Sequence, residues 1–305
     1  RSELPAAAGV TYLALTPFAL FYSSSIHHEP WCFAFFNLTA FCYITHLRTG
    51  GKRSLLATCA AYFLLSQSYW FYYMSAGILL LALQWHERKL SLRDTALLVL
   101  MPLAAALTTF LQVAYALGSF DAALFRMHDI AAARTLDLRI EHSQWYPDKK
   151  FLQPHHLQKY PQIVLERIEA LSGTPALAFA AMLAVSCIKA NRQRVGFIFL
   201  VITAALSWNL VMIQHTVIHR FAGMYGWFAW TLIVATCVHT LPKRWSIALA
   251  LLLLGPQLTH DYFPYLARYA KAAYTGQAQP RHFVRPTKKD PQPTAADPLE
   301  DHDMR

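Results

Sequence analysis

The sequence predicts an all-α fold, a polytopic transmembrane helical bundle of about nine spans. Three observations lead to this prediction. The chain has 305 residues, of which 55% are hydrophobic and only 14% charged, whereas soluble domains usually carry about 25% charged residues. All 17 acidic residues lie outside the apolar runs or at their edges, as lipid contact requires, because burying one in hydrocarbon costs at least ~2.5 kcal/mol. Finally, the basic residues gather in alternate short loops.

Nine stretches of low polarity are the candidate spans. They run over residues 6–22, 31–47, 54–65, 69–85, 95–117, 175–189, 195–213, 221–241 and 245–256. Several are shorter than the ~20 residues that cross a bilayer perpendicularly, so these either extend into polar flanks or form half-helices inside the bundle. The third and fourth stretches count as two helices because Ser66-Gln67-Ser68 marks a break between them.

Basic residues distinguish one side of this bundle from the other. Four alternate short loops hold eleven of them, namely Arg48, Lys52, Arg53, Arg88, Lys89, Arg93, Lys189, Arg192, Arg194, Lys243 and Arg244. The intervening short loops, 23–30, 66–68 and 214–220, hold only Arg220. Because cytoplasmic loops carry such an excess of Lys and Arg, the eleven residues mark the cytoplasmic side and are consistent with nine alternating spans.

The long segment 118–174 then falls outside the cytoplasm, and its seven basic residues are matched by seven acidic ones. Long segments cross membranes largely regardless of charge, so we expect an extracytoplasmic loop. Within it, residues 119–142 have the pattern of an amphipathic helix lying along the membrane interface. Prolines at 147, 154 and 161 break the segment before residues 162–171 resume a helical pattern.

We therefore predict a transmembrane domain over residues 1–260 that contains this loop. Residues 261–305 are expected to form an extracytoplasmic, largely disordered tail, because the stretch from about 276 is rich in Pro, Asp and Lys. The chain begins Arg1-Ser2-Glu3 and enters an apolar run almost at once, from which we expect an N-terminally incomplete chain.

The net charge of +10 does not indicate nucleic-acid binding. Many basic residues sit in the short loops, and the chain has no RNP-like, zinc-finger or Gly-rich phosphate motif. The five cysteines fall within hydrophobic segments without CxxC spacing, so we expect them to be small packing residues. Membrane lipids are the expected surroundings, and the sequence does not indicate an oligomeric state.

Glu29 is the only acidic residue in the short outer loops. It follows His27 and His28 and precedes Pro30, at the outer entrance of the second span. A carboxylate beside two imidazoles could act as a general base or hold a divalent cation. A helix cap explains these residues equally well, because Pro30 suits a first helical turn and Glu29 complements the helix dipole.

His215 and His219 stand four residues apart and precede Arg220 in another outer loop. On a helix the two imidazoles would share one face and could grip a metal ion or a phosphate, and Arg220 adds a fork for phosphate oxygens. On these residues alone, simple contact with lipid headgroups is the preferred explanation. Glu29, His215 and His219 are the candidate ligands for a divalent metal ion, the one cofactor considered.

Two further clusters lie on the same side. Arg134, between Asp129 and Asp137, could meet a phosphate at the membrane surface, although a solvated charged face is the commoner explanation for such a run. Tyr69 and Trp70 open an aromatic run that is typical of an interfacial belt, and aromatic rings also stack on sugars.

These features, in this order, resemble the membrane region of the GT-C superfamily, which includes the protein mannosyltransferase and aminoarabinose transferase families. Leu15-Thr16-Pro17 running to Ser25 and Glu29 resembles a helix-to-helix passage in which an acidic residue opens a helix on the outer side. Residues 52–74 resemble the family's basic loop, apolar helix and polar break. His215-x3-His219-Arg220-Phe221 leading to Met224-Tyr225 resembles its "His…His-x-Phe…Tyr" passage ahead of a late helix. The likeness covers roughly residues 5–260.

The resemblance implies an inverting transfer of a sugar from a polyprenyl-phosphate donor to a cell-envelope acceptor, on the periplasmic face of a bacterial inner membrane. Under it Glu29 is the second acidic residue of the site, and it is the only candidate catalytic base that the topology places in a short outer loop. The donor phosphate would lie near Arg134, His215, His219 and Arg220. The substrate cleft would include His28, Tyr69, Trp70 and Tyr225. The superfamily's main catalytic acid sits in a first outer loop that the matched region starts too late to include, so we expect that loop and the N-terminal helices to be missing here.

Two other hypotheses remain open, a transporter or flippase for a lipid-linked intermediate and a non-catalytic membrane partner subunit. Transporters often hold charged or broken-helix sites at mid-membrane. Apart from Lys189, the last residue of the stretch 175–189, no Asp, Glu, Lys or Arg falls in a predicted span, and no internal repeat is evident. The glycosyltransferase hypothesis is therefore preferred, without an identified sugar, acceptor or metal.

Overall fold

The described part of the chain consists of α-helices and the turns between them. The computed structural model describes residues 3–15, 29–68, 72–132, 157–188, 190, 192–213, 216, 226–256 and 267. Eleven helices occupy these ranges: α1 (Leu4–Leu15), α3 (Glu29–Thr49), α4 (Lys52–Ser68), α5 (Tyr72–His86), α6 (Leu92–Leu117), α7 (Phe120–Ala132), α9 (Tyr160–Ser172), α10 (Ala176–Ile188), α11 (Arg192–Val211), α13 (Trp227–Thr240) and α14 (Lys243–Pro256). The predicted all-α class is confirmed.

Each predicted span overlaps a helix in its described part. The third and fourth spans are separate helices, although Ser66, Gln67 and Ser68, which were predicted to form the break, are the last three residues of α4. The Tyr62 hydroxyl of α4 donates a hydrogen bond to the Tyr73 carbonyl of α5 at 2.7 Å. In one continuous helix, atoms eleven residues apart would be separated by roughly 16 Å along the axis. The chain therefore reverses direction between α4 and α5. The first span is described only as far as residue 15, and the predicted tail, 261–305, lies outside the described residues except for position 267.

The two predicted helices of the long loop are found with different ends. Helix α7 is described to Ala132, short of the predicted end at 142, and residues 133–156 lie outside the described ranges. Helix α9 begins at Tyr160 with Pro161 in its first turn. The prediction that Pro161 interrupts the chain is wrong, because the first helical turn does not use the backbone N–H that proline lacks.

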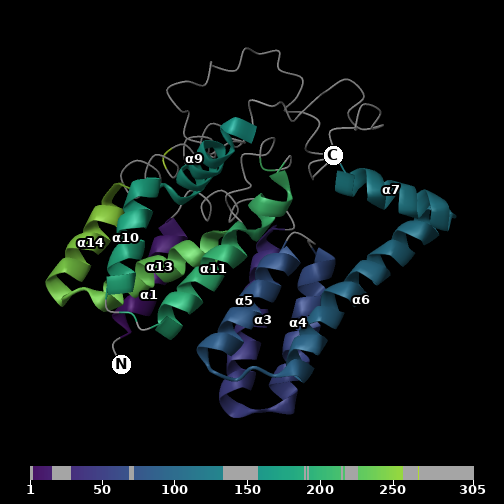
Figure 1. Cartoon of the computed structure of the whole chain (residues 1–305), viewed down its shortest axis with the longest axis horizontal. Coiled ribbons are helices and arrows are strands. Elements are labelled where there is room, and N and C mark those ends of the chain that lie inside the picture. The colour runs from purple at the N-terminus through teal and green to yellow at the C-terminus, as the bar shows by residue number, and fades with distance from the viewer. Residues whose placement is uncertain are drawn as a thin grey trace.

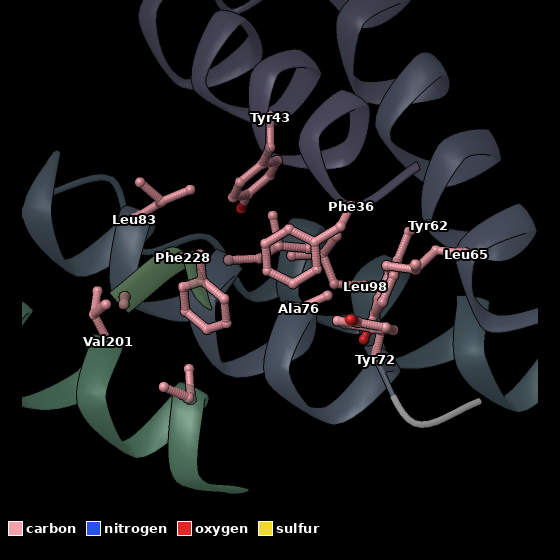
Figure 2. Packing of buried hydrophobic residues seen from close by; sticks show 14 of the residues in the cluster. Phe36, Tyr43, Tyr62, Leu65, Tyr72, Ala76, Leu83, Leu98, Val201 and Phe228 are labelled. Carbon is pink, nitrogen blue, oxygen red and sulfur yellow. The ribbon is translucent and has the colours of Figure 1, made fainter. Parts of the chain in front are cut away.

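Buried side chains form two clusters that meet at α13. The first cluster includes residues of α3, α4, α5, α11 and α13, and Figure 2 shows its Phe36, Tyr72 and Phe228 side chains close together. The second cluster joins α1, α9, α10, α13 and α14. Trp230 of α13 packs against both clusters, so α13 links the two groups of helices seen in Figure 1.

Small residues allow close helix packing at α1 and α13. A Cβ added at Gly9 of α1 would lie 3.2 Å from both the Thr231 carbonyl oxygen and the Ala235 Cβ of α13. Close approach of backbones over Gly, Ala and Thr is characteristic of helix pairs in membranes.

Two helices, α6 and α11, are long and apolar enough to cross a membrane, judged by length and composition alone. Only 11% of the most apolar part of α6 is buried. Its exposed side chains include Val99, Leu100, Leu103, Leu107 and Leu111. A row of this length on a helix surface indicates contact with lipid or with another apolar surface, because contiguous apolar patches on soluble monomers are usually small.

The loops rich in basic residues lie at one end of the helices. The Lys89 ammonium of the α5–α6 turn donates to the Leu47 carbonyl near the end of α3. Arg88 Nε of the same turn donates to Gln193 Oε1 at the start of α11 at 2.8 Å. In Figure 1 the α3–α4 and α5–α6 turns lie at the bottom, and the ends of α10 and α13 with the starts of α11 and α14 lie at the lower left. This arrangement agrees with the predicted alternation of basic loops.

Arg88 follows the end of α5 in a left-handed conformation, with φ 53°. Glycine is the usual residue at such a helix end, and other residues pay roughly 1–2 kcal/mol there. We expect Arg88→Gly to be more stable than Arg88→Ala by about 1 kcal/mol, because both variants lose the Gln193 bond but only glycine relieves the strain. Thermal unfolding of both variants in detergent measures this difference, and equal melting temperatures would contradict the assignment of strain.

Candidate functional site

The predicted site residues lie largely outside the described ranges. Glu29 is the first residue of α3, with Pro30 in the first turn, which is the backbone position expected of a helix cap. The other predicted site residues fall outside the described residues, and these are His28, Tyr69, Trp70, Arg134, His215, His219, Arg220 and Tyr225. The described residues that flank them show which helix ends come together.

An aromatic cluster joins the N-terminal turns of three helices. The ring centroid of Phe33 in α3 lies 4.3 Å from that of Trp227, the first residue of α13. Phe36, one turn further along α3, lies 5.5 Å from Trp227 and 6.0 Å from Tyr72, the first residue of α5. The starts of α5 and α13 therefore converge on the N-terminal half of α3, the half that is remote from the basic loops.

Three of the predicted segments adjoin this cluster in the sequence. Glu29 precedes Phe33 by one helical turn, Trp70 precedes Tyr72 by two residues, and Tyr225 precedes Trp227 by two residues. Helix N-termini carry free backbone N–H groups and a partial positive charge. Helix N-termini that gather in this part of the molecule suit an anion such as a phosphate.

A hydrogen-bond network lies beside the segment that contains His215. Asn209 Nδ2 of α11 donates to Thr216 Oγ1 at 3.3 Å, and the Tyr160 hydroxyl of α9 donates to the Asn209 carbonyl. The network ties the long loop, through α9, to the end of α11. Helix α7, which precedes Arg134, instead packs on α6, with Phe120 and Phe110 rings 5.9 Å apart, and lies away from α13 in Figure 1. The described residues thus do not bring the Arg134 segment to the aromatic cluster.

A second polar site, at the basic end, was not predicted. His46 of α3 and Asp94 in the first turn of α6 are both buried, and His46 Nε2 lies 3.0 Å from Asp94 Oδ2. His46 Nδ1 lies 3.0 Å from the Gly51 carbonyl oxygen, at the start of α4. Two guanidinium nitrogens of Arg93 lie 3.3 Å from Asp94 Oδ1. The pair joins three helices.

The charge of Asp94 follows from these contacts. It lies in the polar turn before the apolar stretch 95–117. Burial opposes ionisation of its carboxyl, but hydrogen bonds and positive charge from His46 and Arg93 outweigh burial and lower its pKa. Because both imidazole nitrogens of His46 contact a partner, neither is left to take a proton from a substrate. The arrangement therefore fits a structural ion pair better than a catalytic one.

The sequence carried a signal for the position of Asp94, but not for its partner. Ser91-Leu92-Arg93-Asp94 has the spacing of a helix capping box, and the Ser91 hydroxyl does accept a hydrogen bond from the Asp94 backbone N–H. Ser91 N–H donates to buried Gln84 Oε1 at 3.2 Å, a bond from α5 that the spacing does not predict. The contact of Asp94 with His46, 48 residues away, has no local signal.

The remaining candidates for reactive side chains are the cysteines and the possible metal ligands. Cys32, Cys59 and Cys237 are buried, as expected of packing residues. Among the described residues, no group of three or more His, Cys, Asp or Glu side chains could hold a metal ion. The candidate metal ligands His215 and His219 lie outside those ranges.

Comparison with known proteins found no matching family, no similar curated protein and no similar solved structure.

Proposed function

We propose that this chain is a polytopic membrane protein that transfers a sugar from a polyprenyl-phosphate donor to a cell-envelope acceptor, on the side opposite the basic loops. The convergence of the starts of α3, α5 and α13, joined by the Phe33–Trp227 and Phe36–Tyr72 contacts, is the observation that carries the proposal. The starts of α5 and α13 follow Tyr69–Trp70 and Tyr225 closely in the sequence, and α3 begins at Glu29, so their convergence supports a shared site.

The membrane location is supported by three features of the described residues. Helices α6 and α11 have the length and composition of spans. Helix α1 packs on α13 through small residues, as helices do in lipid. Helix α7 exposes Phe120, Leu124 and Phe125, which suits a helix lying at a membrane interface.

The chemistry would proceed as a single displacement. The Glu29 carboxylate takes the proton of the acceptor hydroxyl while that oxygen attacks the anomeric carbon of the sugar. The bond between the anomeric carbon and the phosphate oxygen breaks, and polyprenyl phosphate leaves with the bonding electrons. The three helix N-termini, with His215, His219 and Arg220, would stabilise the charge of the departing phosphate. The roles of Glu29, His215, His219 and Arg220 follow the resemblance to the GT-C superfamily.

The test is sugar transfer from a radiolabelled polyprenyl-phosphate donor in membranes that contain the full-length protein. We expect Glu29→Gln to lower the rate at least 100-fold, the lower range for loss of a general base. His219→Ala is expected to lower it by about tenfold or more, since a hydrogen bond to a charged group contributes roughly 1.5–3 kcal/mol. Glu87→Gln is the matched control, because it makes the same change in the α5–α6 turn at the basic end.

Loss of transfer in the first two variants, with protein level and Glu87→Gln activity intact, would support the proposal. Wild-type rates in both variants would return Glu29 to a helix cap and His219 to a headgroup contact. If no donor in a broad panel supports transfer, but the protein moves a labelled lipid-linked intermediate across vesicles, the transporter hypothesis replaces this one.

A further inference from the structure

The basic end of the molecule has cations where helix electrostatics disfavour them. Helices α4, α11 and α14 begin with Lys52-Arg53, with Arg192 and Arg194, and with Lys243-Arg244, and none has an acidic residue in its first turn. A helix N-terminus is itself partly positive and favours acidic side chains. Local helix stability therefore does not account for these residues.

Arg88 is a further cation at a position that local backbone structure disfavours. It occupies a left-handed position that favours glycine, and its guanidinium is directed to Gln193, next to Arg192. Gln193 in turn donates to the His86 carbonyl at 2.6 Å, which fixes the α5–α6 turn against the start of α11. The bonds of Arg88 and Gln193 hold the two basic segments side by side in spite of their like charge.

Apolar side chains are interleaved with these cations. In the turn Lys89-Leu90-Ser91-Leu92-Arg93, Leu90 is 69% exposed and Leu92 is 88% exposed. The Asp94 carboxylate contacts Arg93, and Glu87 stands next to Arg88. These two acidic residues offset part of the charge, and the cations of the turn and of the start of α11 remain in excess. A surface with both strong positive charge and protruding leucines matches a ligand that has an anionic headgroup and hydrocarbon chains.

We infer that the α5–α6 turn and the start of α11 form a binding site for anionic phospholipids. Arg88 and Arg192 contact the phosphodiester, and Leu90 and Leu92 enter the boundary between headgroups and acyl chains. The inference rests on the membrane location in the proposed function, but not on sugar transfer. The leucines favour a lipid over a soluble phosphate, because a free anion has nothing to place against them.

Native mass spectrometry of the detergent-solubilised protein, titrated with dioleoyl-phosphatidylglycerol or the zwitterionic dioleoyl-phosphatidylcholine, tests this site. We expect tighter binding of phosphatidylglycerol. Each basic residue near an anionic lipid surface contributes about fivefold in affinity, so Arg88→Gln/Arg192→Gln should weaken it on the order of 25-fold. Lys159→Gln removes a positive charge before α9, outside both the proposed site and the interfacial helix α7, and should bind the lipid as the wild type does, whereas Arg88→Gln alone should lose about fivefold.

A second pair of measurements distinguishes binding of a lipid from binding of a soluble anion. Leu90→Ser/Leu92→Ser should weaken phosphatidylglycerol binding severalfold and leave any binding of glycerol phosphate unchanged. Three outcomes would each overturn the site. The first is equal affinity for the two lipids, the second is equal loss of binding in the arginine and control variants, and the third is competition by glycerol phosphate at matching concentration. Sugar transfer measured on the same variants keeps a failure here distinct from a failure of the proposed activity.

Discussion

Replacing Asp94 by alanine is expected to destabilise the folded protein by about 3–5 kcal/mol, because it leaves the buried His46 without its partner. His46 would also lose its tie to α6 while still contacting the Gly51 carbonyl. Because the Asp94 pKa is lowered in the folded state, the stability it contributes is present above the unfolded value of about 3.9. That contribution is lost as the pH falls through the folded pKa. Thermal unfolding in detergent at neutral and at acidic pH measures both effects.

Two companion variants test whether the loss of stability comes from the His46–Asp94 pair rather than from Asp94 alone. His46→Leu/Asp94→Leu removes both charges and should recover most of the loss, because buried ion pairs are often replaced by apolar residues at little cost. Arg93→Gln is the control at an adjacent position, since the Arg93 side chain is 71% exposed and exposed pairs contribute about 0–1 kcal/mol. A double variant as unstable as Asp94→Ala would show that His46 and Asp94 are not energetically coupled.

The second large effect is expected at Gly77 of α5, which lies against the Tyr62 side chain of α4. A Cβ at this position would lie 2.8 Å from the Tyr62 hydroxyl oxygen. That hydroxyl is held by its hydrogen bond to the Tyr73 carbonyl, and the Tyr62 ring is buried. Alanine normally improves a helix by about 1 kcal/mol over glycine, but here we expect Gly77→Ala to destabilise by about 1–3 kcal/mol through overpacking.

A rescue experiment identifies the clash. In a Tyr62→Phe background the hydroxyl is absent, and the next atom, Tyr62 Cζ, lies 4.0 Å from the added Cβ. Gly77→Ala should then be neutral or stabilising relative to Tyr62→Phe alone. Gly255→Ala is the matched control, because no atom lies within 4 Å of a Cβ at that position of α14. If Gly77→Ala destabilises the protein equally with and without the hydroxyl, contact with the Tyr62 hydroxyl is not the cause.

Features encoded in local sequence were predictable here. Every apolar stretch overlaps a helix in its described part, because helix formation depends on local composition. Two helices were correctly predicted over 54–85, but the residues chosen as the break, Ser66-Gln67-Ser68, form the end of α4. The charged loops indicated which helix ends share a side. Pro161 was misjudged, because proline has opposite effects at the first turn and in the interior of a helix, and the sequence around it does not by itself show where α9 begins.

The sites were less predictable, for a physical reason. Glu29 was identified as the start of a helix, and that position is confirmed, whereas its catalytic role stays a prediction. The His46–Asp94 pair was missed because each residue stands at the edge of a different span, and only tertiary packing brings them to 3.0 Å. In the same way, Phe33, Tyr72 and Trp227 are ordinary aromatic residues in sequence, and their convergence depends on how α3, α5 and α13 cross.

The length of α6 has a consequence for the bilayer itself. With 26 residues, the helix is about 39 Å long, whereas the hydrocarbon core of a typical membrane is about 30 Å thick. Helix α4, with 17 residues, reaches only about 26 Å. Under the proposed topology, α6 must tilt, and lipids beside α4 must be compressed relative to lipids beside α6. The protein would thus impose a thickness gradient on its lipid annulus and favour bilayers that deform easily.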